Sequence, residues 1–179
     1  MTILLVRHCA VAKRWQGICY GQSDIGLSRE GKQEARRLAE QLAYQPITAI
    51  IHSGLKRTAI LAQYIAQRID IEPSVDTRWQ ERNFGSWEGR SWNAIYRKTG
   101  NAMDQMLTDP AHFQPGGGET TNELSARVMA AWQDVPVGRR IIIISHGGPI
   151  AMVRRNQAGA VVAEVAHYIP PVGSVTQID

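Results

Sequence analysis

Two histidines stand directly after apolar runs that have the composition of buried strands. His8 follows a run that ends in Arg7, and His146 follows a run that contains four successive isoleucines. A third apolar run ends at His52, and Arg57 comes soon after it, in the first turn of an expected helix. In open α/β sheets, ligands bind at the carboxyl ends of the strands. We therefore expect His8 and His146, together with the two arginines, to converge on one pocket.

The chemistry that suits such a cluster is phosphoryl transfer. The guanidinium groups of Arg7 and Arg57 match phosphate oxygens with paired, charge-assisted hydrogen bonds. A neutral imidazole nitrogen of His8 can attack phosphorus in line, and His146, if protonated, can stabilise charge on the equatorial oxygens. The side chains therefore predict an enzyme whose nucleophile is a histidine.

A departing alkoxide needs a proton, which a nearby carboxylic acid can supply. Glu81 is the candidate acid, and Glu88, further along the same segment, is the alternative. The Cys, His and Asp residues do not cluster at the spacing of metal ligands. We therefore expect neither a metal nor a cofactor.

The elements that must position these residues alternate between strands and helices. Apolar, β-branched runs predict strands over 2–7, 47–52, 139–145 and 174–178. Helical spacing of apolar residues predicts helices over 28–44 and 54–69 and from about 120 and 148. This alternation predicts a three-layer α/β/α fold, with a mostly parallel open sheet and helices on both faces.

The segment over about 84–118 departs from the alternation. It holds Trp87, Trp92 and Tyr96, and it ends in the glycine run 116–118. We expect it to form a lid over one end of the sheet. Its aromatic side chains are expected to form a small core, with stacking on a nucleoside base as the alternative. The glycines lack the Lys-Ser/Thr of a phosphate-binding loop and are expected to be a flexible hinge.

Composition limits the class of protein. The chain has 179 residues, of which 44% are hydrophobic and 20% charged, which is typical of one globular domain, here 1–179. It has no apolar run of the ~20 residues that a membrane helix needs. No signal peptide is recognised at the N-terminus, and Cys9 and Cys19 suit a reducing compartment. We therefore expect a cytoplasmic protein without a membrane partner, as a monomer or a homodimer.

The charge balance favours a small anionic ligand. The formal net charge is +4, but the basic residues are scattered and form no patch of the kind that binds nucleic acid. A modest positive surplus instead attracts small anions. We expect a small phosphorylated substrate and no nucleic-acid partner.

Four segments together resemble the histidine phosphatase superfamily, which includes phosphoglycerate mutases. The segment ending in Arg7-His8 resembles its Arg-His-Gly motif, and 53–58 resembles its Ser-Pro-Leu-x-Arg-Ala segment. The segment 81–89 is similar to its acid-bearing segment, and 145–148 to its second catalytic histidine motif. Each motif alone is short, but the order and spacing of all four match, and the resemblance covers essentially the whole chain.

The resemblance implies residue roles. His8 would become phosphohistidine and then be hydrolysed by water. Arg7, Arg57 and His146 would hold the phosphoryl group, while Glu81 would donate and then accept the proton. The family needs no metal for this chemistry.

The chain departs from the family pattern beside the nucleophile. Cys9 stands where the family usually has Gly, and Ala10-Val11 replaces the common Glu-Thr pair. A cysteine is small enough to lie beside a phosphate, but the closer backbone approach of glycine is lost. Gly54 replaces a proline, which removes only loop rigidity.

One subgroup resembles this chain further. The segment 19–24, Cys-Tyr-Gly-Gln-Ser-Asp, and the segment 115–120 look like those of bacterial α-ribazole phosphatases, which remove a 5′-phosphate from a nucleoside during cobalamin assembly. A broad-specificity phosphatase and a phosphoglycerate mutase-like enzyme are alternatives. A non-catalytic phosphate-binding module is a third alternative, from a different class.

Overall fold

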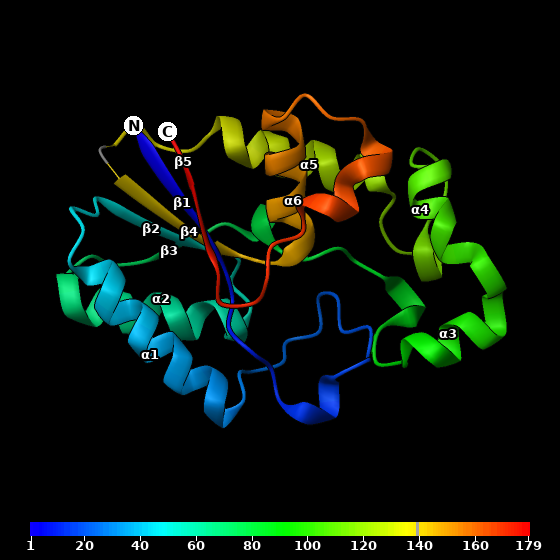
Figure 1. Cartoon of the computed structure of the whole chain (residues 1–179), viewed down its shortest axis with the longest axis horizontal. Coiled ribbons are helices and arrows are strands. Elements are labelled where there is room, and N and C mark those ends of the chain that lie inside the picture. Colours follow the sequence, from blue (N-terminus) through cyan, green and yellow to red (C-terminus); the bar gives the residue numbers. More distant parts are fainter. Residues whose placement is uncertain (139) are drawn as a thin grey trace.

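The computed structural model describes residues 1–138 and 140–179, and it is built on a five-stranded sheet. The strands are β1 (Thr2–Arg7), β2 (Ala49–His52), β3 (Ser74–Val75), β4 (Arg140–Ser145) and β5 (Val175–Ile178), in the order β3-β2-β4-β1-β5. The first four are parallel, and β5 pairs antiparallel with β1 (Figure 1). The expected mostly parallel open sheet is confirmed; the expected strand start at Arg139 lies outside the described residues.

Helices cover both faces of the sheet (Figure 1). The pair α1 (Arg29–Ala43) and α2 (Lys56–Ile69) packs on one face, and the pair α5 (Thr121–Gln133) and α6 (Gly147–Gln157) packs on the other. Alternate side chains of each central strand enter the two cores: Ile142 and Ile144 enter one, and Ile141 and Ile143 the other. The isoleucine run is therefore buried on both faces, as the three-layer prediction requires.

Local sequence explains where the helices begin. Ser28 caps α1, and Thr120 and Glu123 form a reciprocal capping box at α5. The helix α2 starts at Lys56, later than expected, because Gly54 has a φ of 85° and Leu55 is extended. The shorter 3₁₀ turns are η1 (Lys13–Trp15), η2 (Thr77–Trp79), η3 (Gly85–Trp87), η4 (Gly100–Asp104), η5 (Pro115–Gly117) and η6 (Val162–Tyr168). Within the described part of the chain, no helix is long and apolar enough to cross a membrane.

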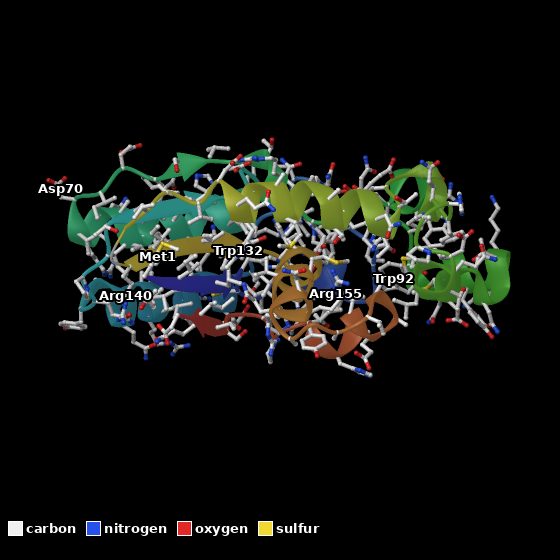
Figure 2. All side chains as sticks on the ribbon, turned by 90° about the horizontal axis from the view of Figure 1, so that it is seen from above. Met1, Asp70, Trp92, Trp132, Arg140 and Arg155 are labelled. Carbon is white, nitrogen blue, oxygen red and sulfur yellow. The ribbon has the colours of Figure 1, made fainter. Side chains whose placement is uncertain are left out.

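The expected insertion forms one end of the molecule. It carries α3 (Trp92–Thr99) and α4 (Gln105–Thr108), which lie far from the edge where the chain starts (Figures 1 and 2). Cys19, Trp87 and Ile95 form a small buried core there, with further side chains packed around it: Phe84, Trp92, Met103 and Phe113. The expected small core is therefore confirmed for both tryptophans, whereas Tyr96 is 59% exposed.

The glycine run of the insertion is closely packed. A Cβ atom at Gly116 would collide with the carbonyl of Phe84, and one at Gly118 with the carbonyl of Asn83. These glycines let η5 lie backbone to backbone against η3. The absence of side chains therefore serves a close contact. The expected hinge motion stays a prediction.

Candidate active site

The register of the sheet brings the two motif histidines together. β1 and β4 are parallel neighbours in which Arg7 is paired with Ser145, so His8 and His146 leave the sheet side by side. The His8 backbone N–H donates to the Ser145 carbonyl at 3.1 Å. The two imidazole rings meet edge to face, with their centroids 5.2 Å apart.

Backbone geometry fixes the tautomer of His8. Its Nδ1 lies 2.8 Å from the carbonyl oxygen of Cys9, and because a carbonyl only accepts, Nδ1 must carry the proton. Nε2 therefore keeps its lone pair. Burial, reinforced by the charge of Arg57, lowers the pKa of His8 to about 3. The ring is consequently neutral at physiological pH, as a nucleophile must be.

His146 is held in the opposite tautomer. Arg57 Nε donates to His146 Nδ1 at 3.2 Å, so Nε2 carries the proton and donates to Ser53 Oγ at 2.8 Å. Ser53 is in turn 2.8 Å from the hydroxyl of Thr58, which donates to the carbonyl of Leu55. The second histidine is thus oriented by a hydrogen-bond chain from the start of α2.

The charge of His146 depends on whether a phosphoryl group is bound. Burial, then the charge of Arg57, lowers the pKa of His146 well below its ordinary value, so the ring is neutral in the empty site. Stabilisation of phosphate charge by this ring requires the protonated form. The negative charge of an arriving phosphoryl group raises the pKa of the His146 ring and so favours its protonation.

Arg57 is a buried cation without a carboxylate partner. Its side chain is fully buried, and its Nη1 and Nη2 atoms donate to the carbonyls of Ser23 and Gly21 at 2.8 and 2.6 Å. The ring of Tyr20 lies 5.2 Å from the guanidinium carbon. Among the described residues, no acidic side chain forms an ion pair with it. The site therefore holds a positive charge that a bound anion can neutralise.

Arg7 supplies a second cation. Its Nη1 donates to the Pro170 carbonyl at 2.6 Å, whereas its buried Nε has no hydrogen-bond partner in the described part of the chain. A Cβ atom at Gly147 would lie 3.1 Å from the guanidinium carbon. The glycine directly after His146 therefore makes room for the arginine directly before His8.

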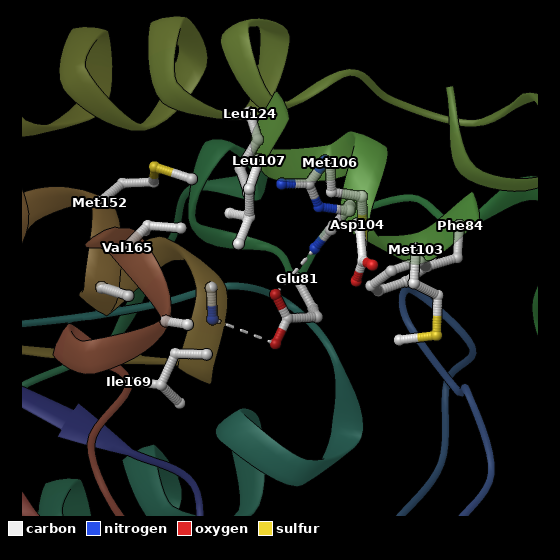
Figure 3. Close-up of a pocket in the computed structure, with 14 residues that line it drawn as sticks. Glu81, Phe84, Met103, Asp104, Met106, Leu107, Leu124, Met152, Val165 and Ile169 are labelled. Atoms are coloured by element: carbon white, nitrogen blue, oxygen red, sulfur yellow. Dashed lines mark hydrogen bonds between the residues drawn. The ribbon is translucent and has the colours of Figure 1, made fainter. Parts of the chain in front are cut away.

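The structure separates the two candidate acids. Glu81 accepts from the backbone N–H groups of Arg82 and Gly148 at 2.9 and 3.3 Å, and it lines a cavity beside the second histidine motif (Figure 3). A Cβ atom at Gly148 would collide with this carboxylate, which explains the second glycine of that motif.

Glu88 has a different set of contacts. Its carboxylate accepts from Gln22 N, Ser23 Oγ and Phe84 N at 2.9, 2.8 and 3.2 Å. These bonds tie the loop after the nucleophile to the insertion. Because its oxygens are already occupied by three donors, Glu88 is the weaker candidate for a proton donor to substrate.

The departure at Cys9 does not enter the site. The Cys9 side chain is fully buried in the core formed with α1 and α2, and only its backbone carbonyl contacts His8. Burial, with Glu34 nearby, raises the pKa of the thiol to about 12. Cys9 and Cys19 are both free cysteines. The contact that sets the His8 tautomer is therefore one that glycine would make equally well.

Sequence reasoning missed the part played by Ser53, whose hydroxyl accepts from His146. The signal was the register: β2 pairs with β4, so the residue after His52 emerges beside the end of β4. Tyr20, which follows Cys19 in the segment 19–24, lies against Arg57.

Comparison with known proteins agrees with this geometry. The model of the histidine phosphatase superfamily (branch 1) matches residues 3–179. The chain belongs to the histidine phosphatase superfamily. A probable phosphoglycerate mutase, GpmB, of Escherichia coli O1:K1 / APEC is 33% identical over 150 residues, which are 82% of this chain and 70% of that protein.

Solved structures of other proteins share the whole fold. A mycobacterial glucosyl-3-phosphoglycerate phosphatase superposes with a TM-score of 0.85 at 26% identity, over 98% of this chain and 88% of the other. YhfR of Bacillus stearothermophilus superposes with a TM-score of 0.88 at 26% identity, over 99% of this chain and 90% of the other. The α-ribazole phosphatase of Shigella flexneri superposes with a TM-score of 0.85 at 22% identity, over 100% of this chain and 90% of the other. At that identity the likeness shows the fold alone.

Proposed function

We propose that the chain is a single-domain, metal-independent phosphomonoester hydrolase that works through a phosphohistidine. His8 is the nucleophile, and Arg7, Arg57 and His146 hold the phosphoryl group. Glu81 is the acid and then the base. The observation that carries the proposal is the pairing of two neutral imidazoles with two arginines, of which Arg57 is wholly buried without a carboxylate partner among the described residues.

The reaction has two balanced steps. In the first, the lone pair of His8 Nε2 forms a bond to phosphorus while the ester P–O bond breaks, and Glu81 gives its proton to the leaving alkoxide. In the second, Glu81 takes a proton from water, the water oxygen bonds to phosphorus, and the P–N bond breaks. Phosphate leaves and His8 is restored.

The proposed substrate is α-ribazole 5′-phosphate, which would place the chain in cobalamin biosynthesis. Support comes from the segment 19–24, which looks like that of α-ribazole phosphatases and provides Tyr20 and Gly21 to the surroundings of Arg57. The test is a screen of phosphate release from α-ribazole 5′-phosphate, phosphoglycerates and nucleotides. We expect the highest kcat/KM on the ribazole ester; a higher value on a phosphoglycerate would contradict the assignment.

Mutase activity is the alternative that the name of the Escherichia coli relative raises. A mutase keeps water away from phosphohistidine and passes the label to a second acceptor. Single-turnover transfer of ³²P separates the two activities. We expect label in inorganic phosphate, and label on a second phosphoglycerate would overturn the phosphatase assignment.

The role of Glu81 has its own test in Glu81→Gln. The amide cannot donate a proton as a carboxylic acid does, so we expect a large loss on alkyl phosphates, whose leaving groups are poor. p-Nitrophenyl phosphate has a leaving group that departs without a proton, and its turnover should fall far less. The control is Glu88→Gln, which should not change the ratio of the two rates. Equal loss on both substrates in Glu81→Gln would remove Glu81 from the acid role.

A further inference from the structure

Glu81 lines a cavity of about 340 Å³ (Figure 3). Its walls come from the insertion, α5, α6 and η6, and they are mainly apolar. The apolar side chains that define it are Met103, Met106, Leu107, Leu124, Met152 and Val165. Neither Arg7 nor Arg57 lines it, so it is a compartment beside the phosphate-binding cluster.

The charge of this cavity is unsuited to a second anion. Arg82 is the cation among its described lining residues, and two carboxylates, those of Glu81 and Asp104, line the same cavity. The guanidinium of Arg82 is held by the Glu119 carbonyl and Thr121 Oγ1, at 3.1 and 3.0 Å. A carboxylate or a second phosphate placed here would lose water in a compartment that already holds acidic side chains.

The chemistry of the reaction assigns an occupant to the cavity. In an in-line displacement, the leaving oxygen lies opposite the attacking His8 nitrogen. The acid must lie within hydrogen-bond reach of that oxygen. The body of the leaving alcohol therefore lies on the side of Glu81, and the space on that side is the apolar cavity.

We propose that this cavity selects phosphate monoesters whose alcohol has a neutral, apolar body, aliphatic or aromatic, and disfavours esters with a second anionic group. The inference rests on the proposed function and specifies its substrate class. Three methionines give the wall flexible, polarisable side chains, which adapt to apolar groups of different shape. A second hollow, of about 330 Å³, is lined by Trp15, Tyr20 and Trp92 and by Ala10, and it shares no lining residue with the first cavity.

The test is a series of straight-chain alkyl monophosphates from ethyl to hexyl. The leaving oxygens have nearly equal basicity across the series, so only the buried apolar area changes. We expect kcat/KM to rise about fourfold per methylene until the cavity is full. We also expect 3-phosphoglycerate to be a poorer substrate than butyl phosphate. A flat series with measurable turnover would overturn this inference alone, while no turnover of any ester would overturn the phosphatase assignment as well.

Two variants locate the effect. Met106→Glu places a charge in the cavity wall and should collapse the hexyl-to-ethyl ratio of kcat/KM. Because the ratio is taken within one variant, a partial loss of folded protein cancels. The matched control is Trp15→Ala, in the second hollow, which should keep the wild-type ratio. If the hexyl-to-ethyl ratio of kcat/KM fell in Trp15→Ala but not in Met106→Glu, the alcohol would lie in the hollow that Trp15 lines, and the proposal would be refuted.

Discussion

His8→Ala abolishes phosphomonoester turnover, because it removes the atom that forms the covalent intermediate. The geometry leaves no substitute: His146 Nδ1 accepts from Arg57 and its Nε2 donates to Ser53, so neither of its nitrogens offers a free lone pair. The measurement is a steady-state assay on p-nitrophenyl phosphate together with labelling by a ³²P-phosphomonoester, quenched in alkaline detergent. We expect no turnover and no acid-labile, base-stable label in the variant.

The chain offers a matched control in His52→Ala. His52 is also a buried histidine at the end of a parallel strand, and its Nδ1 accepts from the backbone N–H of Gly54. In the part of the chain that the structure describes, no hydrogen bond joins the His52 side chain to His8, Arg57 or His146, so the variant should keep both turnover and label. Turnover by His8→Ala near the level of His52→Ala would overturn the covalent mechanism.

Arg57→Ala should lower kcat/KM by about 10²-fold or more, because Arg57 is a charge stabiliser aimed at the transition state. The loss has two physical sources. The guanidinium no longer neutralises the phosphoryl oxygens, and His146 Nδ1 loses the hydrogen bond that Arg57 donates. Steady-state kinetics on an ester with a good leaving group measures the loss, since departure of that group does not depend on Glu81.

Two further variants separate the charge of Arg57 from its directed hydrogen bonds and from a general effect of removing an arginine. Arg57→Lys keeps the charge but cannot reproduce the three directed contacts to His146, Ser23 and Gly21, so it should recover only part of the rate. Arg68→Ala, on the same helix, removes an arginine whose partner is the exposed carboxylate of Glu40. It should leave kcat/KM unchanged. An Arg57→Ala variant as active as Arg68→Ala would remove Arg57 from phosphate binding.

The features that sequence predicted best are those that composition encodes directly. Four successive isoleucines have no polar position to turn toward water, so β4 had to be buried on both faces. Once β1 and β4 were placed in a parallel sheet, the positions of His8 and His146 followed from where each strand ends. The fold and the position of the histidine pair were therefore predictable.

Other features depend on contacts between distant segments. β3 is two exposed residues long and carries no apolar run, so nothing in its sequence predicts a strand. Glu81 and Glu88 belong to one segment and are chemically equal; only the donors that the fold brings to Glu88 distinguish them. The tautomers depend likewise on the Cys9 carbonyl and Ser53, whose positions arise from the register and the turns.

The close packing of η5 against η3 has a consequence for how this chain tolerates mutation. By composition, the run 115–118 looks like a spacer in which replacements should be harmless. Because a Cβ atom at Gly116 or Gly118 would collide with the backbone of the facing segment, these positions admit no side chain without displacing a wall of the insertion. Gly26, where a Cβ atom would meet open space, tolerates replacement freely. Sequence drift should therefore be slowest where the composition looks least constrained.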